Sequence, residues 1–389
     1  MRAILIGGGI GGLAAALALA RRGVSVTVLE RSPVLGEAGA GLQLGPNATR
    51  VLFDLGLGET LVAKAFAPEA AEIRAATDQR LLLRNALGTT AEARWGAPYL
   101  QLHRADLQAL LHDAVLAAGC AVRLGASVLR IEQDTDRVRV ILSDGTALEA
   151  DLAVGADGVR SGVRQALFGD GAPRFTGQVA WRGVVPIDRL APGMVPPVAA
   201  VWAGRGRHFV HYYVRGGQAV NFVGVVERDW REESWTEPGD PAELQADFAG
   251  WPPVVRAICA AATTPFRWAL FDRPPLPAWT KGRVTLLGDA AHPMLPFLAQ
   301  GAAMAIEDAA VLSHRLEAAA DVPQALKAYE QDRLARTRRV QAASRFNARL
   351  FHLPPVLERA AFLAAGVADS LHPAGTAARF DWLYGYKAP

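Results

Sequence analysis

The chain has 389 residues, enough for about two or three domain-sized units. Hydrophobic residues make up 51% and charged residues 20%, which predicts a packed interior and excludes general disorder. The net charge of +3 is small and its Lys and Arg residues form no basic tract, so we expect no nucleic-acid partner. No apolar stretch reaches the roughly 18 residues of a spanning helix, so we expect a soluble protein without membrane contact.

The two cysteines, Cys120 and Cys259, are isolated and lack the CxxC spacing of a thiol-disulfide or zinc site. We expect both to be small buried core residues in a reducing compartment, the cytoplasm, and we predict no metal site. Five glycines between residues 7 and 12 interrupt the N-terminal apolar run. We therefore interpret this run as a first strand and not as a signal peptide.

The first thirty residues predict a βαβ unit. An apolar run over residues 2–6 is followed by a GxGxxG motif, a helix rich in alanine and leucine, and a second β-rich run that ends before Glu30. In this motif Gly7 permits the tight turn, Gly9 admits a pyrophosphate and Gly12 allows close helix packing. The first helical amides then face the phosphates. This pattern favours a dinucleotide site over a merely structural glycine turn.

Later patterns predict helices and an inserted sheet. Helical spacing covers residues 107–118 and 311–351, a hairpin with Asp144-Gly145 at its turn covers 138–154, and a late strand of the nucleotide domain covers 284–287. Aromatic and valine-rich runs between 175 and 275 predict an antiparallel sheet. We thus predict an α/β fold with a discontinuous nucleotide domain (1–174 and 276–345, with 70–100 contributing partly to the substrate domain), a substrate-binding sheet domain (175–275) and a C-terminal helical segment (346–389).

Three acidic residues follow predicted strands. Glu30 is placed to accept hydrogen bonds from ribose hydroxyls, and Asp289 can bind a sugar-chain hydroxyl. Asp157 stands between glycines that let the backbone approach a cofactor. A helix beginning near Gly301 would point its positive end at whatever lies in front of it. A flavin fits there, because reduced flavin carries negative charge at its pyrimidine end. Asp289 alone would fit a helix cap, and the Asp157 segment alone an ordinary turn.

Together these motifs resemble the single-component, class A FAD-dependent aromatic hydroxylases. The resemblance covers nearly the whole chain and rests on GGGIGGL with Glu30, HRADL at 103–107, GADGVRS at 155–161 and GDAAHPMLPFLAQGAAMAIEDA at 288–309. It implies a Rossmann-like FAD domain of the GR2 type. It also implies that Arg104 contacts the pyrophosphate, Asp157 supports cofactor and pyridine nucleotide, and Asp289 binds the ribityl chain. The cofactor-binding residues expected are Gly7, Gly9, Gly12, Glu30, Arg31, Gln43, Arg104, Val128, Asp157, Asp289, Gly301 and Ala302, the last two at the isoalloxazine.

Within that family the chain is most similar to the branch of salicylate hydroxylase, 3-hydroxybenzoate 6-hydroxylase and 6-hydroxynicotinate 3-monooxygenase. This branch has a His and a Tyr four residues apart facing the substrate, which His208 and Tyr212 match. Positions i and i+4 of a strand share one face, so His211 falls on the other. Without the resemblance, a sheet-surface His beside a core Tyr would be the better interpretation. Pro296 matches a family proline beside the flavin and substrate, and it also rigidifies its loop.

One position departs from the hydroxynicotinate enzymes, which have a histidine where this chain has Gln43. A glutamine cannot act as a base, so any proton-accepting role falls to His208, with Tyr212 hydrogen-bonding the substrate. The resemblance implies that NAD(P)H, with NADH expected, reduces FAD. O2 then forms a C4a-hydroperoxyflavin that hydroxylates a small phenolic acid of the salicylate or hydroxybenzoate type.

Two alternatives stay open at this stage. The flavin motifs would equally serve a hydroxylase of a larger aromatic natural product, or a flavin-binding redox protein without hydroxylase turnover. A disulfide reductase is disfavoured because paired cysteines are lacking. The nicotinamide is expected to dock transiently because the chain has no second glycine fingerprint. The sequence leaves open the choice between a monomer and a homodimer.

Overall fold

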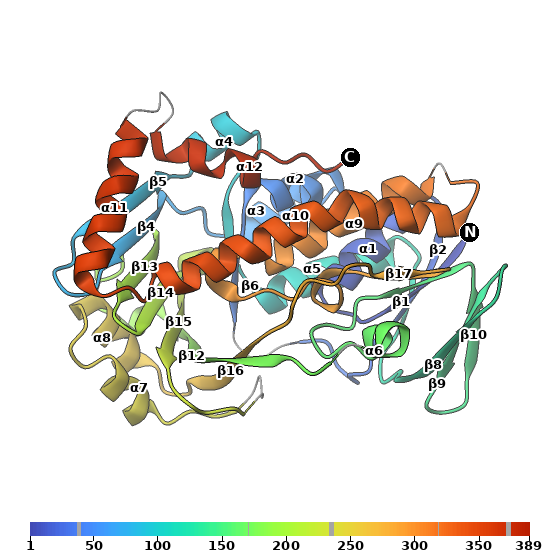
Figure 1. The fold of residues 1–389 in the computed structure, drawn as a ribbon, viewed down its shortest axis with the longest axis horizontal. Coiled ribbons are helices and arrows are strands. Elements are labelled where there is room, and N and C mark those ends of the chain that lie inside the picture. Colours follow the sequence, from blue (N-terminus) through green and yellow to red (C-terminus); the bar gives the residue numbers. More distant parts are fainter. Residues whose placement is uncertain (37–39, 170, 233–236, 318, 371–374) are drawn as a thin grey trace.

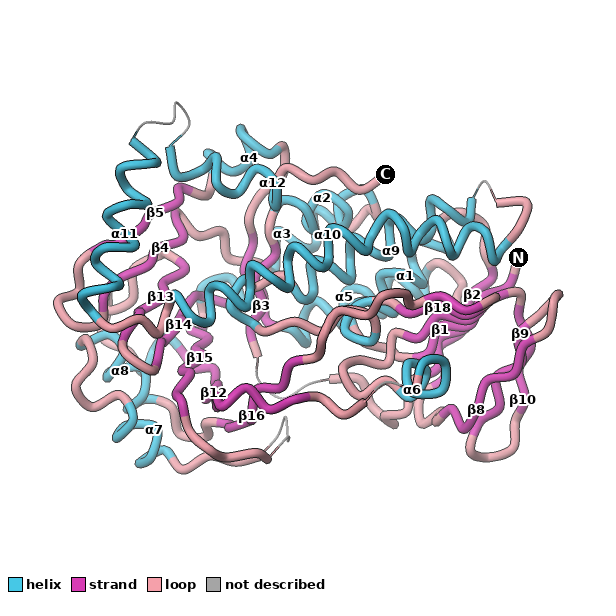
Figure 2. The backbone as a smooth tube through the Cα atoms, viewed as in Figure 1, coloured by secondary structure: helices cyan, strands magenta, loops and turns pink. Residues whose placement is uncertain are grey.

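The computed structural model describes all residues except 37–39, 170, 233–236, 318 and 371–374. Its two large sheets lie at opposite ends of an elongated molecule (Figures 1 and 2). The six-stranded sheet has the order β17 (Thr280–Lys281), β18 (Val284–Leu286), β11 (Leu152–Gly155), β1 (Arg2–Ile6), β2 (Ser25–Leu29), β7 (Ala121–Arg123). Its pairs are parallel except β17 with β18. The fold is thus mixed α/β, as predicted.

The second large sheet has seven strands in the order β16 (Phe266–Asp272), β12 (Arg174–Pro186), β15 (Ala219–Glu227), β14 (Arg207–Val214), β13 (Ala199–Gly204), β4 (Ala70–Ala75), β5 (Leu81–Ala86). Two small sheets complete the strands: β10 (Ala147–Ala150), β9 (Val138–Leu142) and β8 (Val128–Gln133) form one, and β3 (Gly41–Leu44) pairs with β6 (Leu100–His103) in the other. The turn between β9 and β10 contains Asp144-Gly145, where Gly145 has φ +85°, as the hairpin prediction required.

The helices are α1 (Ile10–Ala20), α2 (Pro46–Asp54), α3 (Gly58–Lys64), α4 (Thr89–Trp95), α5 (Arg104–Ala117), α6 (Gly162–Phe168), α7 (Pro241–Asp247), α8 (Pro253–Ala261), α9 (Gly301–Glu317), α10 (Val322–Leu350), α11 (Pro355–Ser370) and α12 (Asp381–Tyr384). Short 3-10 turns are η1 (Ile187–Arg189), η2 (Arg215–Gly217), η3 (Gly288–Ala290), η4 (Pro296–Leu298) and η5 (Gly375–Phe380). Figure 1 shows α10 running from the six-stranded sheet to the seven-stranded one. No helix in the described part of the chain combines the length and apolarity of a membrane span.

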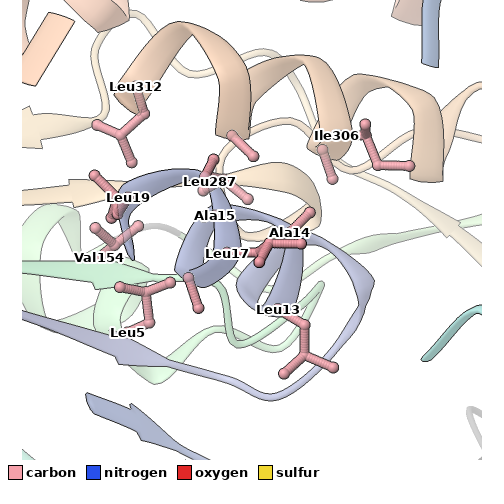
Figure 3. Packing of buried hydrophobic residues seen from close by; sticks show 14 of the residues in the cluster. Leu5, Leu13, Ala14, Ala15, Leu17, Leu19, Val154, Leu287, Ile306 and Leu312 are labelled. Carbon is pink, nitrogen blue, oxygen red and sulfur yellow. The ribbon is translucent and has the colours of Figure 1, made fainter. Parts of the chain in front are cut away.

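The first core forms around α1, whose sequence is apolar on every side and therefore suits a fully buried helix. Leu13, Leu17 and Leu19 belong to one buried cluster that also contains side chains of the six-stranded sheet and of α9, such as Leu5 and Ile306 in Figure 3. Gly11 allows the close approach of α9, because a Cβ there would lie 2.9 Å from the Cβ of Ala305. Both cysteines are buried, as expected.

The seven-stranded sheet differs in two respects from the antiparallel sheet predicted for residues 175–275. Its β13 pairs in parallel with β4, which comes from a distant part of the chain and so is not constrained by a hairpin. The segment also includes the amphipathic helices α7 and α8, which cover one face of the sheet. The other face packs against η4 and the end of α10 through Leu295, Phe297 and Phe351. The predicted substrate residues His208 and Tyr212 lie on that second face.

Candidate active site

In the glycine turn between β1 and α1, a side chain would clash with the protein at Gly7 and Gly12 but not at Gly9. A Cβ on Gly7, whose φ is +117°, would lie 2.3 Å from the Ala156 carbonyl oxygen. A Cβ on Gly12 would lie 2.0 Å from the carbonyl oxygen of Gly7. At Gly9 a Cβ would meet nothing within 4 Å, and no side chain caps the helix there. At Gly9, unoccupied space lies next to the first amides of α1, and a pyrophosphate needs both.

Glu30 follows β2 and holds this turn. Its Oε2 accepts a hydrogen bond from the Gly8 amide at 2.7 Å, and its Oε1 accepts one from the Ser32 amide at 2.8 Å. The Glu30 carbonyl accepts a bond from the Ala126 amide at 2.8 Å, two residues before Val128 begins β8. This bond places the segment that leads into Val128 beside Glu30 and the following Arg31, and cofactor contact by Arg31 and Val128 stays a prediction. Carboxylate oxygens accept more than one bond, so the predicted ribose contact stays a prediction.

A second group of predicted cofactor residues meets at the start of α9. A Cβ on Gly301 would lie 3.9 Å from Oδ1 of Asp289, and Ala302 follows in the first helical turn. Surrounding protein raises the pKa of the Asp289 carboxyl by desolvation, although the positive charge of Arg104 opposes this shift. Asp289 is nevertheless exposed to solvent. The exposed carboxyl is accessible to a ligand, and the predicted ribityl contact of Asp289 stays a prediction.

Asp157 lies beside the glycine turn but points its carboxylate at α6. Its Oδ1 accepts from the Ser161 hydroxyl, and its Oδ2 accepts from the Val163 amide at 3.2 Å. Burial raises the pKa of the Asp157 carboxyl, against these hydrogen bonds. The ordinary-turn interpretation accounts for these contacts, while the neighbouring Ala156 brings the segment to Gly7. A direct cofactor role for Asp157 stays a prediction.

The two predicted substrate residues lie on β14. His208 and Tyr212 share the face that packs against η4 and β3. The His208 ring centroid is 5.0 Å from that of Phe297, next to Pro296, and a Cβ on Gly41 would lie 2.7 Å from Cε2 of Tyr212. Both side chains are buried. They therefore occupy the space between the sheet and the loop that leads to Gly301.

His211 lies on the opposite face of β14, where its Nε2 accepts a hydrogen bond from Nε1 of Trp202 at 3.1 Å. The alternation predicted for this strand is thus present. Gln43, on β3, accepts a hydrogen bond at its Oε1 from the Tyr99 hydroxyl at 2.9 Å. Its side chain therefore faces tyrosines near Tyr212 rather than the glycine turn. Cofactor contact by Gln43 stays a prediction.

Sequence reasoning missed two sets of polar residues around the site. His352 bonds to the predicted base, His208, from 144 positions away. Asp308 and Arg333 form an ion pair between α9 and α10 that is completely buried. Asp308 lies inside a motif quoted above, but only its long-range partners reveal what it does. No local spacing marked His352.

Comparisons with known proteins identify the family of the chain. A family model described as FAD binding domain matches residues 1–344. The chain is 42% identical over 392 aligned residues to 3-amino-4-hydroxybenzoate 2-monooxygenase PtnB3 of Streptomyces platensis (100% of this chain, 96% of that one). It is 40% identical to 3-hydroxybenzoate 6-hydroxylase of Polaromonas naphthalenivorans (99% and 96%). Among solved structures, a salicylate hydroxylase substrate complex superposes with a TM-score of 0.84 at 29% identity (100% and 96%). Klebsiella pneumoniae HpxO with FAD and uric acid gives 0.82 at 31% (94% and 92%).

Proposed function

Because the chain belongs to the FAD-dependent aromatic hydroxylases, we propose that it uses NAD(P)H and O2 to hydroxylate a small phenolic acid of the hydroxybenzoate type. Relatives named for hydroxybenzoates match the chain over almost its full length, which supports this substrate class. The observation that carries the proposal is the buried face of β14. It sets one imidazole and one phenol, His208 and Tyr212, opposite the loop that carries Pro296.

The chain's own residues have separate tasks in this reaction. Gly9 and the first amides of α1 would hold the FAD pyrophosphate, Asp289 would hold the ribityl chain, and the positive end of α9 at Gly301 would stabilise negative charge on a bound flavin. Bound FAD supplies hydride acceptance and oxygen activation. Pro296 restricts the backbone at the start of η4, in the loop that leads to Gly301.

His208 and Tyr212 act on the substrate. Nε2 of His208 has no hydrogen-bond partner within the described residues, so it is free to accept the proton of the substrate phenol. The phenolate formed in this way is the electron-rich ring that hydroxylation needs. The Tyr212 hydroxyl donates a hydrogen bond to the substrate, and because burial raises the pKa of this phenol it remains a donor at neutral pH.

We also propose the domain boundaries, the electron donor and the cellular location. We assign FAD binding to residues 1–174 and 276–345 in a GR2-type arrangement. The substrate is assigned to the sheet of residues 175–275 together with strands from 70–100, and residues 346–389 form a C-terminal segment. NADH is the proposed electron donor, docking transiently. Buried, isolated Cys120 and Cys259 support a reducing, cytoplasmic location.

A substrate panel tests the proposal. Enzyme loaded with FAD is mixed with NADH and salicylate, 3-hydroxybenzoate, 3-amino-4-hydroxybenzoate or 6-hydroxynicotinate, and a bicyclic phenol represents larger substrates. We expect a monocyclic acid to stimulate NADH oxidation, with a product heavier by one oxygen in mass spectrometry. Hydroxylation of the bicyclic phenol alone would favour the natural-product alternative. FAD binding without aromatic-dependent NADH consumption would favour the redox-protein alternative.

A further inference from the structure

His208 is the buried end of a line of three side chains that reaches solvent. Its Nδ1 lies 2.8 Å from Nε2 of His352, and Nδ1 of His352 lies 2.8 Å from Oε1 of Glu227. Exposure rises along this line, from 1% for His208 to 5% for the His352 side chain and 56% for that of Glu227. The line therefore connects the substrate face of the sheet with bulk water.

Backbone contacts fix the line in place. The chain turns sharply after α10, and the carbonyls of Phe351 and His352 accept hydrogen bonds from the amides of Gly204 and Gly206 at 3.1 and 3.4 Å. Glu227 is the last residue of β15, and its amide donates to the Gly206 carbonyl at 3.0 Å. The three groups come from three separate segments that meet at the hairpin between β13 and β14.

The carboxylate at the outer end determines where the protons sit. An ionised carboxylate only accepts hydrogen bonds, so Nδ1 of His352 must carry the proton that it donates to Glu227. Nε2 of a neutral His352 is then a bare acceptor, and Nδ1 of His208 must donate to it. This leaves Nε2 of His208 unprotonated. Gln178 also approaches Nδ1 of His352, but at 3.4 Å its contact is too long to compete.

We propose that Glu227 and His352 are positioning residues that hold His208 as a base and carry the substrate's phenolic proton to solvent. The inference rests on the proposed function. The phenol O–H bond breaks as Nε2 of His208 takes the proton. Nδ1 of His208 releases its own proton to Nε2 of His352, and Nδ1 of His352 releases one to Glu227 and then to water. The reverse sequence protonates the product phenolate and restores both rings, so no other reactant is needed.

The surroundings favour this route. The rings of Phe297 and Phe351 flank His208, with centroids 5.0 and 5.4 Å from its own. Burial, and then the nearby His352, lower the pKa of His208 well below its ordinary value. Burial also lowers the pKa of His352, although Glu227 opposes that shift. Both rings are therefore neutral near pH 7, as the assignment of protons requires.

The first test reads the tautomers directly and needs no turnover. Holoenzyme labelled with 15N-histidine is studied by NMR, and a His208→Gln spectrum identifies the His208 signals. We expect the proton of His208 on Nδ1 and bare Nε2. Glu227→Gln introduces an amide that can donate to His352, so Nε2–H of His208 should appear, whereas Glu227→Asp should retain the original form. A wild-type His208 protonated at Nε2, or one that ignores Glu227→Gln, overturns the proposal.

The second test follows the proton. In stopped-flow mixing, the absorbance of a bound hydroxybenzoate reports phenolate formation, and a pH indicator reports release to solvent. We expect His352→Gln to slow both signals by about tenfold or more while the dissociation constants of FAD and ligand stay nearly unchanged. Free imidazole should restore part of the rate in His352→Ala. A merely structural role predicts weaker binding, unchanged deprotonation and no rescue, and that result would refute the relay.

Matched controls remove a histidine or a glutamate elsewhere. His314→Gln on α9 and Glu59→Gln on α3 change exposed residues outside the line, and both should behave as wild type in both tests. The substrate panel separates failure of the function from failure of the relay. If no phenolic acid is hydroxylated while the tautomers are as expected, the proposed function is wrong. If hydroxylation proceeds with His208 protonated at Nε2, only the relay is wrong.

Discussion

Oδ1 of Asp308 lies 2.6 Å from Nε of Arg333, and neither side chain reaches solvent. The other oxygen, Oδ2, accepts hydrogen bonds from the Gly288 amide at 3.0 Å and from Nε2 of His292 at 2.6 Å. A single buried carboxylate therefore joins α9 and α10 to the turn that carries Asp289.

Asp308→Asn should destabilise the protein strongly. The substitution keeps the shape of the side chain but removes one of the two buried carboxylates that pair with Arg333, the other being Glu307, and it turns an NH2 group toward other donors. Breaking a buried pair from one side costs about 3–5 kcal/mol, and urea unfolding of the apoprotein measures it. Asp332→Asn is the control, because its ion pair with Arg315 is largely exposed and should contribute about 1 kcal/mol or less. Similar losses in the two variants would contradict the importance of the buried pair.

The same carboxylate should make stability depend on acid. Burial alone would raise the pKa of Asp308, but His292, Arg333 and two hydrogen bonds lower it to about 2. The folded pKa lies below the unfolded value of about 3.9. The stabilisation is therefore present above pH 4 and is lost as pH falls from about 4 to about 2. The unfolding free energy of Asp308→Asn should fall less over this window than that of wild type, and equal slopes would contradict the assignment.

Gly9→Val should expel FAD without unfolding the chain. A Cβ at Gly9 meets no atom of the surrounding protein within 4 Å, and its φ of −73° is one that any residue adopts, so we expect a valine there to clash with a ligand in that space. We expect a colourless protein whose apo unfolding resembles that of wild type. Gly250→Val is the matched control, since a Cβ there is equally unhindered and lies away from α1. A normal flavin spectrum in Gly9→Val would contradict the pyrophosphate assignment.

His208→Ala should keep FAD bound and slow hydroxylation by about 10²- to 10⁴-fold, the usual contribution of a positioned base. In wild type, burial and then His352 lower the pKa of His208. A base works in its unprotonated form, so kcat/KM should decline only well below pH 6.5. Product formation measured against pH checks both statements. An unchanged product rate in His208→Ala would remove this residue from the mechanism.

The local parts of the site were predictable because short sequence spacings encode them. Gly7, Gly9 and Gly12 have their places in one turn, and β-strand alternation put His208 and Tyr212 on one face. Glu30 was located at the end of its strand, but the direction of its oxygens depends on the amides around it.

Long-range contacts could not be predicted in this way. Residues 70–100 were expected to contribute to the substrate domain, but the parallel pairing of β4 with β13, about 130 residues away, is specified by nothing in either strand. His352 follows a long helix whose end is placed by packing, so its bond to His208 has no local signature. The same reason hid the partners of Asp308, whose motif was visible although its contacts with α10 were not.

His211 should make stability depend on pH in a higher window. Burial, and then the charge of Arg74, lower its pKa from about 6.5 to about 4. Between pH 6.5 and pH 4, His211 is therefore protonated in the unfolded chain but neutral in the folded chain. The free energy of unfolding thus decreases as pH falls from about 6.5 to about 4. His211→Gln can keep an acceptor for Trp202, so its unfolding free energy should fall less than that of wild type between pH 7 and pH 4.5. Burial also lowers the pKa of His208, so His208 contributes the same loss of unfolding free energy in wild type and in His211→Gln. His314→Gln, at an exposed site, should follow wild type. If His211→Gln lost as much stability as wild type over this range, His211 would not be held neutral by the fold.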